Sequence, residues 1–556
     1  MNSNLVVSSG YTADVFIPES PFHGLNGLRF FRDQLYAVDL FGDFIHVDRQ
    51  SGNWSVILDA SLAPADDMVF QNSGVVFVTA LLPGEVRKFT PTGFTNDIPT
   101  YSPNYEVIAS HQPQVDPLAI HTSGRFFFGS FPSTGALYEV LLNDGNKEVQ
   151  ILNNTNGLNA FEFGKHPDDQ DWLYSPQGNT GKVIRIQIDT GVTQTVATGF
   201  TYPIAVKINA TGNYLFGVDV YTGLVFRVTL ANGDKEIIAR LEPGLDNLAV
   251  DDQDRVYVSN FVEKGIYEVL PGTGQVRTIL EGAPSQGGKL TTPGGLGFYE
   301  EQGRSVLYVA DLYAYRTLDA NTGAQISLTR VLASPQTSAM SLSLNKQHVI
   351  ITGWILQQVQ ILDRITGAYL ATLNGFSNPY DAIELSDGSL LVADSGTGSI
   401  IHIPNPHGTD PWRVALNGLH CPMGLVADAT ETYFYFTDTE AGTLSRAKIG
   451  EVNGKAEVLV SNLSLPQGIA WDTQQRDRLY LAESGRRQLL AINITTRTQT
   501  TIASNLPINL PPYNMEMGGP VKDVVYIPTG IAVATSGKIY ISANETNAIY
   551  TITPQS

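Results

Sequence analysis

Apolar and polar positions alternate along this chain in a unit that recurs twelve times. One copy, GLDNLAVDDQDRVYVSNFVEKGIYEV, spans residues 244–269. A polar or small residue leads into four or five apolar-biased positions, and a polar turn follows. A second apolar run then ends in Asp, Asn or Ser, and a Gly-containing loop leads to a third run. Runs of this length, separated by turn residues, predict short antiparallel strands.

Most units are followed by one more short strand, such as WSVILD (54–59) or AEVLVS (456–461). Successive units start roughly 40 to 50 residues apart, and four antiparallel strands at this period are typical of a β-propeller blade. Twelve blades in one ring would leave a very wide channel. The pattern therefore predicts an all-β fold with two six-bladed β-propellers in tandem.

The ends of the chain suggest how each ring closes. The last unit stops at AIYTITPQS with no outer strand after it, and YTADVFI (11–17) precedes the first unit. Pairing an early strand with the final blade removes exposed edges. On this hypothesis 11–17 closes the first ring at the sixth unit, and QVRTILEG (275–282) opens the second ring. We therefore expect domains 1–271 and 272–556, divided in the turn PGTG (271–274).

Composition narrows the class of partner. The chain has 556 residues, 42% of them hydrophobic and 16% charged, which predicts extensive buried structure rather than disorder. The formal charge of -20 argues against nucleic acid or an anionic membrane as partner. The single cysteine, Cys421, excludes a Cys-rich zinc site. No signal peptide or membrane span is visible, so we expect a soluble protein, either cytoplasmic or secreted after signal removal.

The residues that open the inner strands should gather at one mouth of each channel, because every inner strand of a propeller runs the same way along it. Five of the six in the first ring are Asp or Asn. Carboxylates that converge in this way repel one another unless they are protonated or neutralised. The first-ring set is Asn26, Asp66, Asp116, Asn159, Tyr202 and Asp246, with Asp67 and Asn247 adjacent.

Carboxylate and amide oxygens are the ligands that Ca²⁺ prefers, and Mg²⁺ or Mn²⁺ accepts similar donors. The alternative is that each Asp or Asn caps the turn that enters its strand. We expect one divalent ion, Ca²⁺, on the axis of the first ring. His23, just before the first inner strand, is the candidate general base, and Asp246 is the other expected catalytic residue. The expected metal ligands are Asn26, Asp66, Asp116, Asn159, Asp246 and Asn247.

This pattern resembles the six-bladed propellers of the gluconolactonase/regucalcin, paraoxonase/arylesterase and strictosidine synthase-like superfamily. LDNLAVD (245–251) looks like the segment that supplies calcium ligands in paraoxonases, and GLNAFEF (157–163) like the segment whose Asn binds the metal in both lactonase groups. The resemblance implies Asn159 and Asp246 as ligands, with Asn247 and Asp116 as additions. Both lactonase groups carry a Glu in the first blade where this chain has Asn26, a deficit that Asp66 or Asp67 could make up.

The residues at the equivalent positions of the second ring include no carboxylate, so we expect no metal site there. They are Gly294, Ser338, Tyr380, Met423, Gln467 and Thr529. An apolar pocket and a plugged channel both fit this mouth. The insertion 505–520 suits a lid over it. The acids that end second strands, Asp311, Asp394, Asp438 and Glu483, are expected to bond loop backbone. The candidate substrate-binding residues are Tyr202, Trp354, Tyr380, Met423 and Gln467.

Three functions remain open at this stage. The first is a metal-dependent hydrolase of the lactonase or arylesterase kind, acting on a small organic substrate at the channel mouth. The second is a metal-independent cyclase or condensing enzyme of specialised metabolism, which holds its substrate in a productive conformer. The third is a binding or scaffold propeller, because the fold alone does not imply catalysis.

Overall fold

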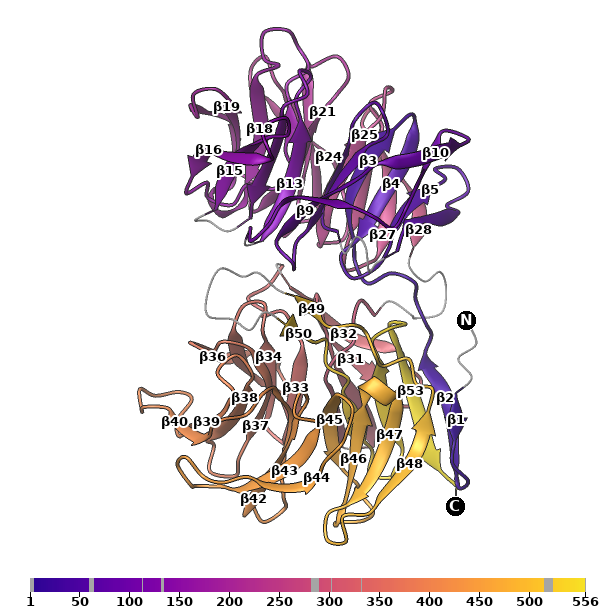
Figure 1. The fold of residues 1–556 in the computed structure, drawn as a ribbon, viewed down its shortest axis with the longest axis vertical. Helices are drawn as coiled ribbons and strands as arrows, with labels where there is room; N and C mark the ends of the chain where they lie inside the picture. The colour runs from indigo at the N-terminus through magenta and orange to yellow at the C-terminus, as the bar shows by residue number, and fades with distance from the viewer. Residues whose placement is uncertain are drawn as a thin grey trace. The chain divides into compact units, whose positions relative to one another are not determined.

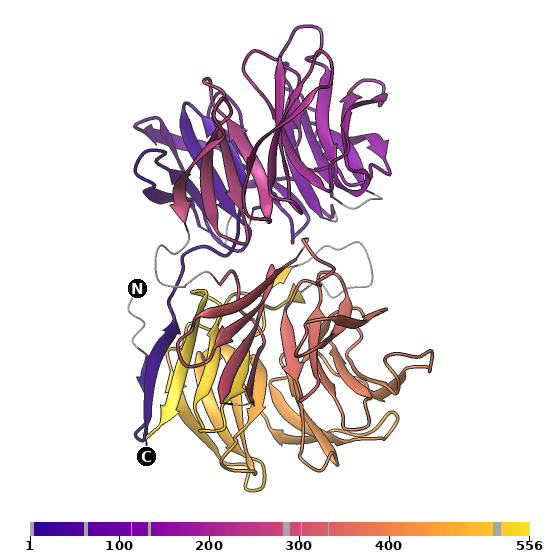
Figure 2. The ribbon, with the colours of Figure 1, turned by 180° about the vertical axis from the view of Figure 1, so that it is seen from behind.

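The computed structural model describes residues 5–59, 65–112, 114–131, 135–281, 290–301, 303–331, 333–514 and 524–555. The chain forms two compact units, each a ring of six antiparallel sheets (Figures 1 and 2). Of the described residues, those from 21 to 281 build the first propeller, and those from 5 to 20, from 290 to 512 and from 524 to 555 build the second. The predicted fold, two six-bladed propellers in tandem, is confirmed.

In the first propeller each blade is contiguous in sequence and runs outward from the channel. Blade 1 is β3 (Leu25–Phe31), β4 (Gln34–Asp39), β5 (Phe44–Val47) and β6 (Trp54–Leu58). Blade 2 is β7 (Met68–Phe70), β8 (Val76–Ala80), β9 (Glu85–Phe89) and β12 (Glu106–Ala109), with the hairpin β10 (Pro91–Thr95) and β11 (Ile98–Tyr101) inserted before its outer strand. Blade 3 is β13 (Val115–Ile120), β14 (Phe126–Ser130), β15 (Ala136–Leu141) and β16 (Lys147–Asn153). Blade 4 is β17 (Glu162–Phe163), β18 (Trp172–Gln177), β19 (Lys182–Gln187) and β20 (Thr193–Thr198). Blade 5 is β21 (Pro203–Ile208), β22 (Tyr214–Asp219), β23 (Leu224–Thr229) and β24 (Lys235–Arg240). Blade 6 is β25 (Leu245–Val250), β26 (Val256–Asn260), β27 (Gly265–Leu270) and β28 (Gln275–Glu281).

The second propeller repeats this plan, but its last blade is completed from the start of the chain. Blade 1 is β29 (Leu296–Glu301), β30 (Arg304–Asp311), β31 (Ala314–Asp319) and β32 (Gln325–Arg330). Blade 2 is β33 (Ser341–Leu344), β34 (His348–Gly353), β35 (Gln358–Asp363) and β36 (Tyr369–Asn374). Blade 3 is β37 (Pro379–Glu384), β38 (Leu390–Asp394), β39 (Ser399–Ile403) and β40 (Arg413–Leu416). Blade 4 is β41 (Pro422–Ala427), β42 (Tyr433–Asp438), β43 (Thr443–Lys448) and β44 (Glu457–Val460). Blade 5 is β45 (Pro466–Trp471), β46 (Arg478–Glu483), β47 (Gln488–Asn493) and β48 (Gln499–Ser504), extended by β1 (Val6–Val7). Blade 6 is β51 (Ile531–Val533), β52 (Ile539–Ala543), β53 (Ala548–Pro554) and β2 (Tyr11–Ile17).

The predicted domain division is wrong, because the two rings close in different ways. β28 pairs with β27 along its whole length, so it belongs to the sixth blade and does not open the second ring. β2 pairs antiparallel with β53, from Tyr11 opposite Pro554 to Ile17 opposite Ile549 (Figure 1). The turn at 271–274 is thus a hairpin within one blade, in which the Gly274 N–H donates to the Leu270 carbonyl at 2.7 Å. A hairpin partner adjacent in sequence costs less loop entropy to pair than a remote strand.

Apolar layers between neighbouring blades form the cores. In the first propeller, Leu25, Leu28 and Leu35 of blade 1 pack with Ala249 and Tyr257 of blade 6, so this ring closes by side-chain packing. In the second propeller, Ile17 of the N-terminal strand joins Leu296, Leu307 and Tyr540 in one buried cluster. The two rings therefore rest on the same kind of inter-blade core, although only the second borrows a strand. No helix among the described residues is long and apolar enough to cross a membrane.

The acids that end second strands fix the loops that lead into inner strands, as predicted. Asp438 accepts the backbone N–H groups of His420 and Cys421 at 2.9 and 2.8 Å. Asp311 and Asp394 each accept two backbone N–H groups in the same way, and Glu483 accepts that of Ser464. This repeated bond orients the residue that opens each inner strand.

We expect Asp438→Ala to lower the free energy of unfolding of the second propeller by about 2 kcal/mol, because two buried N–H groups lose their acceptor. Asp438→Asn keeps one acceptor oxygen and should lose less. Asp410→Ala, at an exposed position in the same propeller, should stay within about 0.5 kcal/mol of the wild type. Urea unfolding followed by fluorescence measures the difference, and equal losses in all three variants would contradict this assignment.

Candidate functional site

Four of the polar residues predicted at the first channel lie where their inner strands bulge, whereas Asp66 and Asn159 lie in the segments that lead into β7 and β17. The pairing of β3 with β4 shifts register between Leu25 and Leu28, around Asn26. β13 shifts between Val115 and Leu118, around Asp116, and β25 shifts between Leu245 and Leu248, around Asp246 and Asn247. A bulge leaves residues unpaired and turns their side chains out of the regular alternation. Local backbone geometry therefore directs these side chains to one end of the channel.

We call this group the acidic end; it comprises Asn26, Asp66, Asp116, Asn159, Asp246 and Asn247. The Asn26 side-chain amide donates to Asp66 Oδ1 at 2.6 Å, and Asp66 is hydrogen-bonded to Asp116. Asp66 and Asp116 are 8% and 5% exposed, whereas Asp246 is half-buried. Among the described residues, no cationic side chain lies within 4.0 Å of these three carboxyl groups. The cluster thus contains two buried acids and one half-buried acid without a countercharge in contact.

The electrostatics follow from this arrangement. Burial, and next the negative charge of Asp66, hold the pKa of Asp116 well above its usual range, and Asp246 and Asp67 add to the effect. Burial, followed by Asp66 and Asp67, likewise raises the pKa of Asp246. Burial also raises the pKa of Asp66, although its hydrogen bonds oppose the shift. Without a neutralising partner, these carboxyls take up protons more readily than exposed ones.

The side-chain amides of two predicted metal ligands, Asn159 and Asn247, accept hydrogen bonds from the backbone. Asn159 Oδ1 accepts the N–H of Ala160 at 2.6 Å, and Asn247 Oδ1 accepts the N–H of Leu248 at 2.8 Å. By contrast, Asn26 Oδ1 is buried and has no hydrogen-bond partner. The capping role, which the sequence left open as an alternative, therefore describes Asn159 and Asn247. Asn26 instead offers a free amide oxygen beside Asp66.

The donor set fits a hard divalent ion in its chemistry. Every available donor is a carboxylate or amide oxygen, which Ca²⁺ prefers. In the part of the chain that the structure describes, no three His, Cys, Asp or Glu side chains come close enough together to hold one ion. A bound ion would therefore combine carboxylates with amide oxygens and water.

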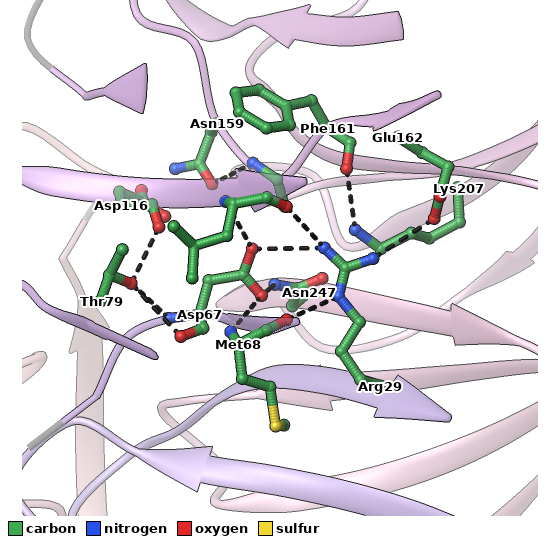
Figure 3. A network of polar contacts seen from close by, with 12 residues as sticks. Arg29, Asp67, Met68, Thr79, Asp116, Asn159, Phe161, Glu162, Lys207 and Asn247 are labelled. Carbon is green, nitrogen blue, oxygen red and sulfur yellow. Dashed lines mark hydrogen bonds and ion pairs between the residues drawn. The ribbon is translucent and has the colours of Figure 1, made fainter. Parts of the chain in front are cut away.

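Below the acidic end, a network of polar contacts fills the channel (Figure 3). Asp67 is fully buried and accepts the N–H groups of Met68 and Leu118, and Asn247 Nδ2 lies 3.4 Å from its Oδ1. The Arg29 guanidinium lies 3.5 Å from Asp67 Oδ2 and 3.3 Å from Glu162 Oε2 (Figure 3). The Asp67 carboxylate is thus bonded to backbone N–H groups and Arg29 within the channel. It does not replace the first-blade Glu as a metal ligand. Sequence reasoning missed Arg29, Glu162 and Lys207, whose signal was a charge inside an otherwise apolar inner strand.

His23 and Tyr202 lie at the loops that enter inner strands. The backbone N–H of His23 donates to Asp39 Oδ2 at 2.6 Å, and its Nδ1 lies 3.9 Å from the same oxygen. Burial raises the pKa of Asp39 to about 7. Tyr202 stacks on Tyr221 with ring centroids 4.9 Å apart. Burial, and next Tyr221 and Asp116, raise the pKa of Tyr202 to about 12, so its hydroxyl stays protonated near the acidic end.

The equivalent end of the second channel is filled by side chains. Trp354 and Tyr380 are fully buried, and Met423 and Gln467 are nearly so. The Tyr380 hydroxyl accepts the N–H of Tyr526 at 2.6 Å, and Gln467 Oε1 accepts that of Thr529 at 2.7 Å. The predicted apolar pocket does not form at this end; the plugged alternative does. Of the proposed lid, Leu506 and Ile508 pack into the core of the second propeller, while residues 515–520 lie outside the described residues.

A cavity of about 360 Å³ instead occupies the second channel beyond this plug. Tyr380 and Met423 line its inner end, and Asn345, Glu384 and Trp471 line it at the far ends of their inner strands. Asp381 also lines it, and burial raises the pKa of Asp381 to about 7. Trp354 and Gln467 do not line this cavity.

No protein-family model matches the chain, and no curated protein matches it. The solved structures that match include "Streptogramin B lyase structure", with a TM-score of 0.37 and 13% sequence identity over 55% of this chain and 96% of that one. They also include the GH74 enzyme of Niastella koreensis, with a TM-score of 0.42 and 12% identity over 97% of this chain and 92% of that one. At these scores neither likeness bears on the reaction.

Proposed function

We propose that the protein is a calcium-dependent hydrolase of a small ester or lactone, with its active site at the acidic end of the first channel. The observation that carries the proposal is the convergence of Asp66, Asp116 and Asp246 beside the unpartnered Asn26 amide oxygen. Buried carboxyls of this kind need either protons or a cation. A few convergent polar groups in a concave site are also what small-molecule binding sites usually present.

Each residue of the site has a role that its position supports. Asp66 and Asp116 would hold the ion together with the Asn26 amide oxygen and water, and Asp246 would add its negative charge from nearby. The backbone-bonded Asn159 and Asn247 would shape the site around it. Ca²⁺, when bound, would polarise the substrate carbonyl and stabilise the developing oxyanion. Tyr202 keeps its proton at neutral pH and donates a hydrogen bond to the substrate. His23, whose backbone N–H bonds Asp39 and whose Nδ1 lies 3.9 Å from the same carboxyl oxygen, is the base that would take a proton from water.

Metal analysis and an ester screen test this proposal together. We expect about one calcium per chain in protein purified without chelator, and hydrolysis of aryl esters or lactones that EDTA abolishes and added Ca²⁺ restores. Asp246→Asn should lower kcat/KM roughly a hundredfold or more. Asp381→Asn, a matched change in the second channel, should leave kcat/KM within a factor of about two. No metal and no hydrolysis would reject the proposal and favour a binding or scaffold role.

The cavity of the second channel supports a second candidate, in which the protein orients an apolar substrate for cyclisation or condensation without a metal. The walls present polar and apolar surface in equal measure, and Asp381 and Glu384 supply carboxyl groups inside them. Holding a reactive conformer is enough to accelerate such a reaction. This candidate predicts the reverse mutant pattern: Asp381→Asn loses activity and Asp246→Asn keeps it.

A further inference from the structure

We propose that the end of the first channel opposite the acidic end binds a small anion that carries a carboxylate or phosphate group. A cavity of about 330 Å³ lies there, within the first propeller. Four of its lining side chains are cationic and one is a carboxylate, in a chain whose formal charge is -20. We call it the basic cavity; these five residues are Arg29, Arg32, Glu162, Lys165 and Lys207.

The charged residues of this cavity are specific to the first propeller, because the equivalent inner-strand positions of the second propeller are uncharged. Arg29, Glu162 and Lys207 occupy one position in three inner strands, since each pairs with the residue three before the end of its neighbouring strand: Tyr36 in β4, Tyr174 in β18 and Phe216 in β22. The same position in the second propeller carries no charge. Its six residues are Gly297, Ser343, Ile383, Val426, Ala470 and Ala532. A six-bladed propeller can therefore fold without charged residues at this position. We infer that the charges of the first propeller serve binding rather than folding.

Arg29 has its partners within the protein. It donates to the Met68 and Leu118 carbonyls at 2.9 and 3.0 Å and contacts the carboxylates of Asp67 and Glu162 (Figure 3). Its charge is thus offset from two sides, and it forms the floor of the basic cavity. A ligand is not needed to account for Arg29.

Lys165 and Lys207 differ from Arg29, because among the described residues their ammonium groups bond only backbone carbonyls. Lys207 Nζ lies 3.3 Å from the Phe161 carbonyl, and Lys165 Nζ lies 2.8 Å from that of Ile208. Neither ammonium group has a carboxylate within 4.0 Å among the described residues. Lys207 is only 3% exposed, so its remaining N–H donors face the channel with little access to water. A buried ammonium group with donors to spare is costly unless an acceptor reaches it.

The electrostatics of the cavity favour an anion. Burial, and next the charge of Arg29, lower the pKa of Lys207 to about 7. Although burial alone would raise it, the charges of Lys165, Arg29 and Lys207 hold the pKa of Glu162 below its usual value, so Glu162 stays ionised. Asp67 and Glu162 together therefore face Arg29, Lys165 and Lys207, and a monoanion would complete the balance when Lys207 is protonated. The enclosed volume suits a small molecule and excludes a nucleic acid duplex or a membrane surface.

Calorimetric titration of the full-length protein with inorganic phosphate, and separately with benzoate, tests the site. Calcium is first removed with EDTA, and the chelator, itself a polycarboxylate, is then dialysed away, so that neither the proposed calcium site nor the chelator contributes to the measurement. We expect saturable binding with one site per chain by at least one of the two anions, and no binding of benzyl alcohol, which lacks the charge. A titration with sodium chloride at the same ionic strength is the control that separates general charge screening from binding of phosphate or benzoate.

Lys207→Met removes the buried ammonium group but keeps most of the side-chain volume, and it should weaken anion binding at least tenfold. Lys235→Met, on the outer strand of the same blade, is the matched control and should bind as the wild type does. Lys165→Met, at an exposed position on the cavity rim, should weaken binding severalfold without risk to the fold. Absence of saturable binding by both anions, or wild-type affinity in both Lys207→Met and Lys165→Met, would overturn the proposal. Loss of hydrolysis with anion binding intact would reject only the proposed function.

Discussion

In the presence of EDTA, the first propeller should lose stability as pH rises from about 4 to 8, and Ca²⁺ should restore it. Burial and neighbouring carboxylates raise the pKa values of Asp66, Asp116 and Asp246 in the folded state. In the unfolded chain an Asp titrates near a pKa of about 3.9. The folded state then holds more protons than the unfolded state, so stability is full below that pKa and falls as pH rises through the raised values.

Calcium should reverse the trend, because the ion binds the ionised carboxylates and competes with protons. A hundredfold excess over the dissociation constant stabilises the folded state by about 2.7 kcal/mol, which corresponds to roughly 5 to 10 °C in Tm for a domain of this size. Hydrogen exchange of peptides from β3 to β28 measures this propeller separately from the second. The stabilisation of the first propeller by calcium should be larger at pH 8 than at pH 5, because more of the carboxyl groups are ionised at pH 8.

Asp116→Asn with Asp246→Asn removes two of the raised carboxyls and should remove most of the calcium response. A part of the pH dependence should remain, because Asp39, whose pKa burial raises to about 7, titrates in the same direction. The matched control is Asp381→Asn, which lies in the second propeller and should leave this response intact. A calcium effect of the same size in the double variant would place the ion elsewhere, and no effect in the wild type would argue against a calcium site.

Deletion of residues 2–20 should unfold the second propeller and leave the first one folded. β2 supplies the outer strand of the last blade, and Ile17 is 2% exposed within the core. Phe16 also packs edge-on against Tyr540, with centroids 5.2 Å apart. Loss of these two side chains and of a seven-residue strand should cost more than about 4 kcal/mol, most of the stability of a typical domain. The bare edge of β53 should then promote aggregation.

A circular permutant that restores β2 at the other end of the chain should rescue the folding of the second propeller. Tyr11 lies opposite Pro554, so residues 11–17 can follow Pro554 through a two-residue hairpin turn in a chain that begins at Pro21. We expect this permutant to regain the melting transition of the second propeller, which calorimetry measures. A fragment of residues 272–556 should fail to fold. If that fragment instead melted cooperatively at the wild-type temperature, β2 would not be required for closure.

The sequence by itself determined the number of blades and the place of the acidic end. Each blade is a local meander of four strands, and the period of apolar runs and turns records it directly. The bulged residues Asn26, Asp116 and Asp246 could be aligned for the same reason, because each opens an inner strand after a recognisable turn. The acids that end second strands were also correctly assigned to loop backbone, since their partners lie no more than 20 residues away in the chain.

Only the tertiary structure decided which strand closes which ring. β2 could pair with the sixth or the twelfth blade on pattern alone, because strand pairing leaves no mark in the residues that is specific to one partner. The same limit applies inside the channels. Whether Asn159 binds an ion or its own backbone, and whether Tyr380 lines a mouth or forms a plug, depends on side chains from several blades that meet on the axis. Arg29, Glu162 and Lys207 lie far apart in sequence, and the ring alone brings their charges together around one cavity.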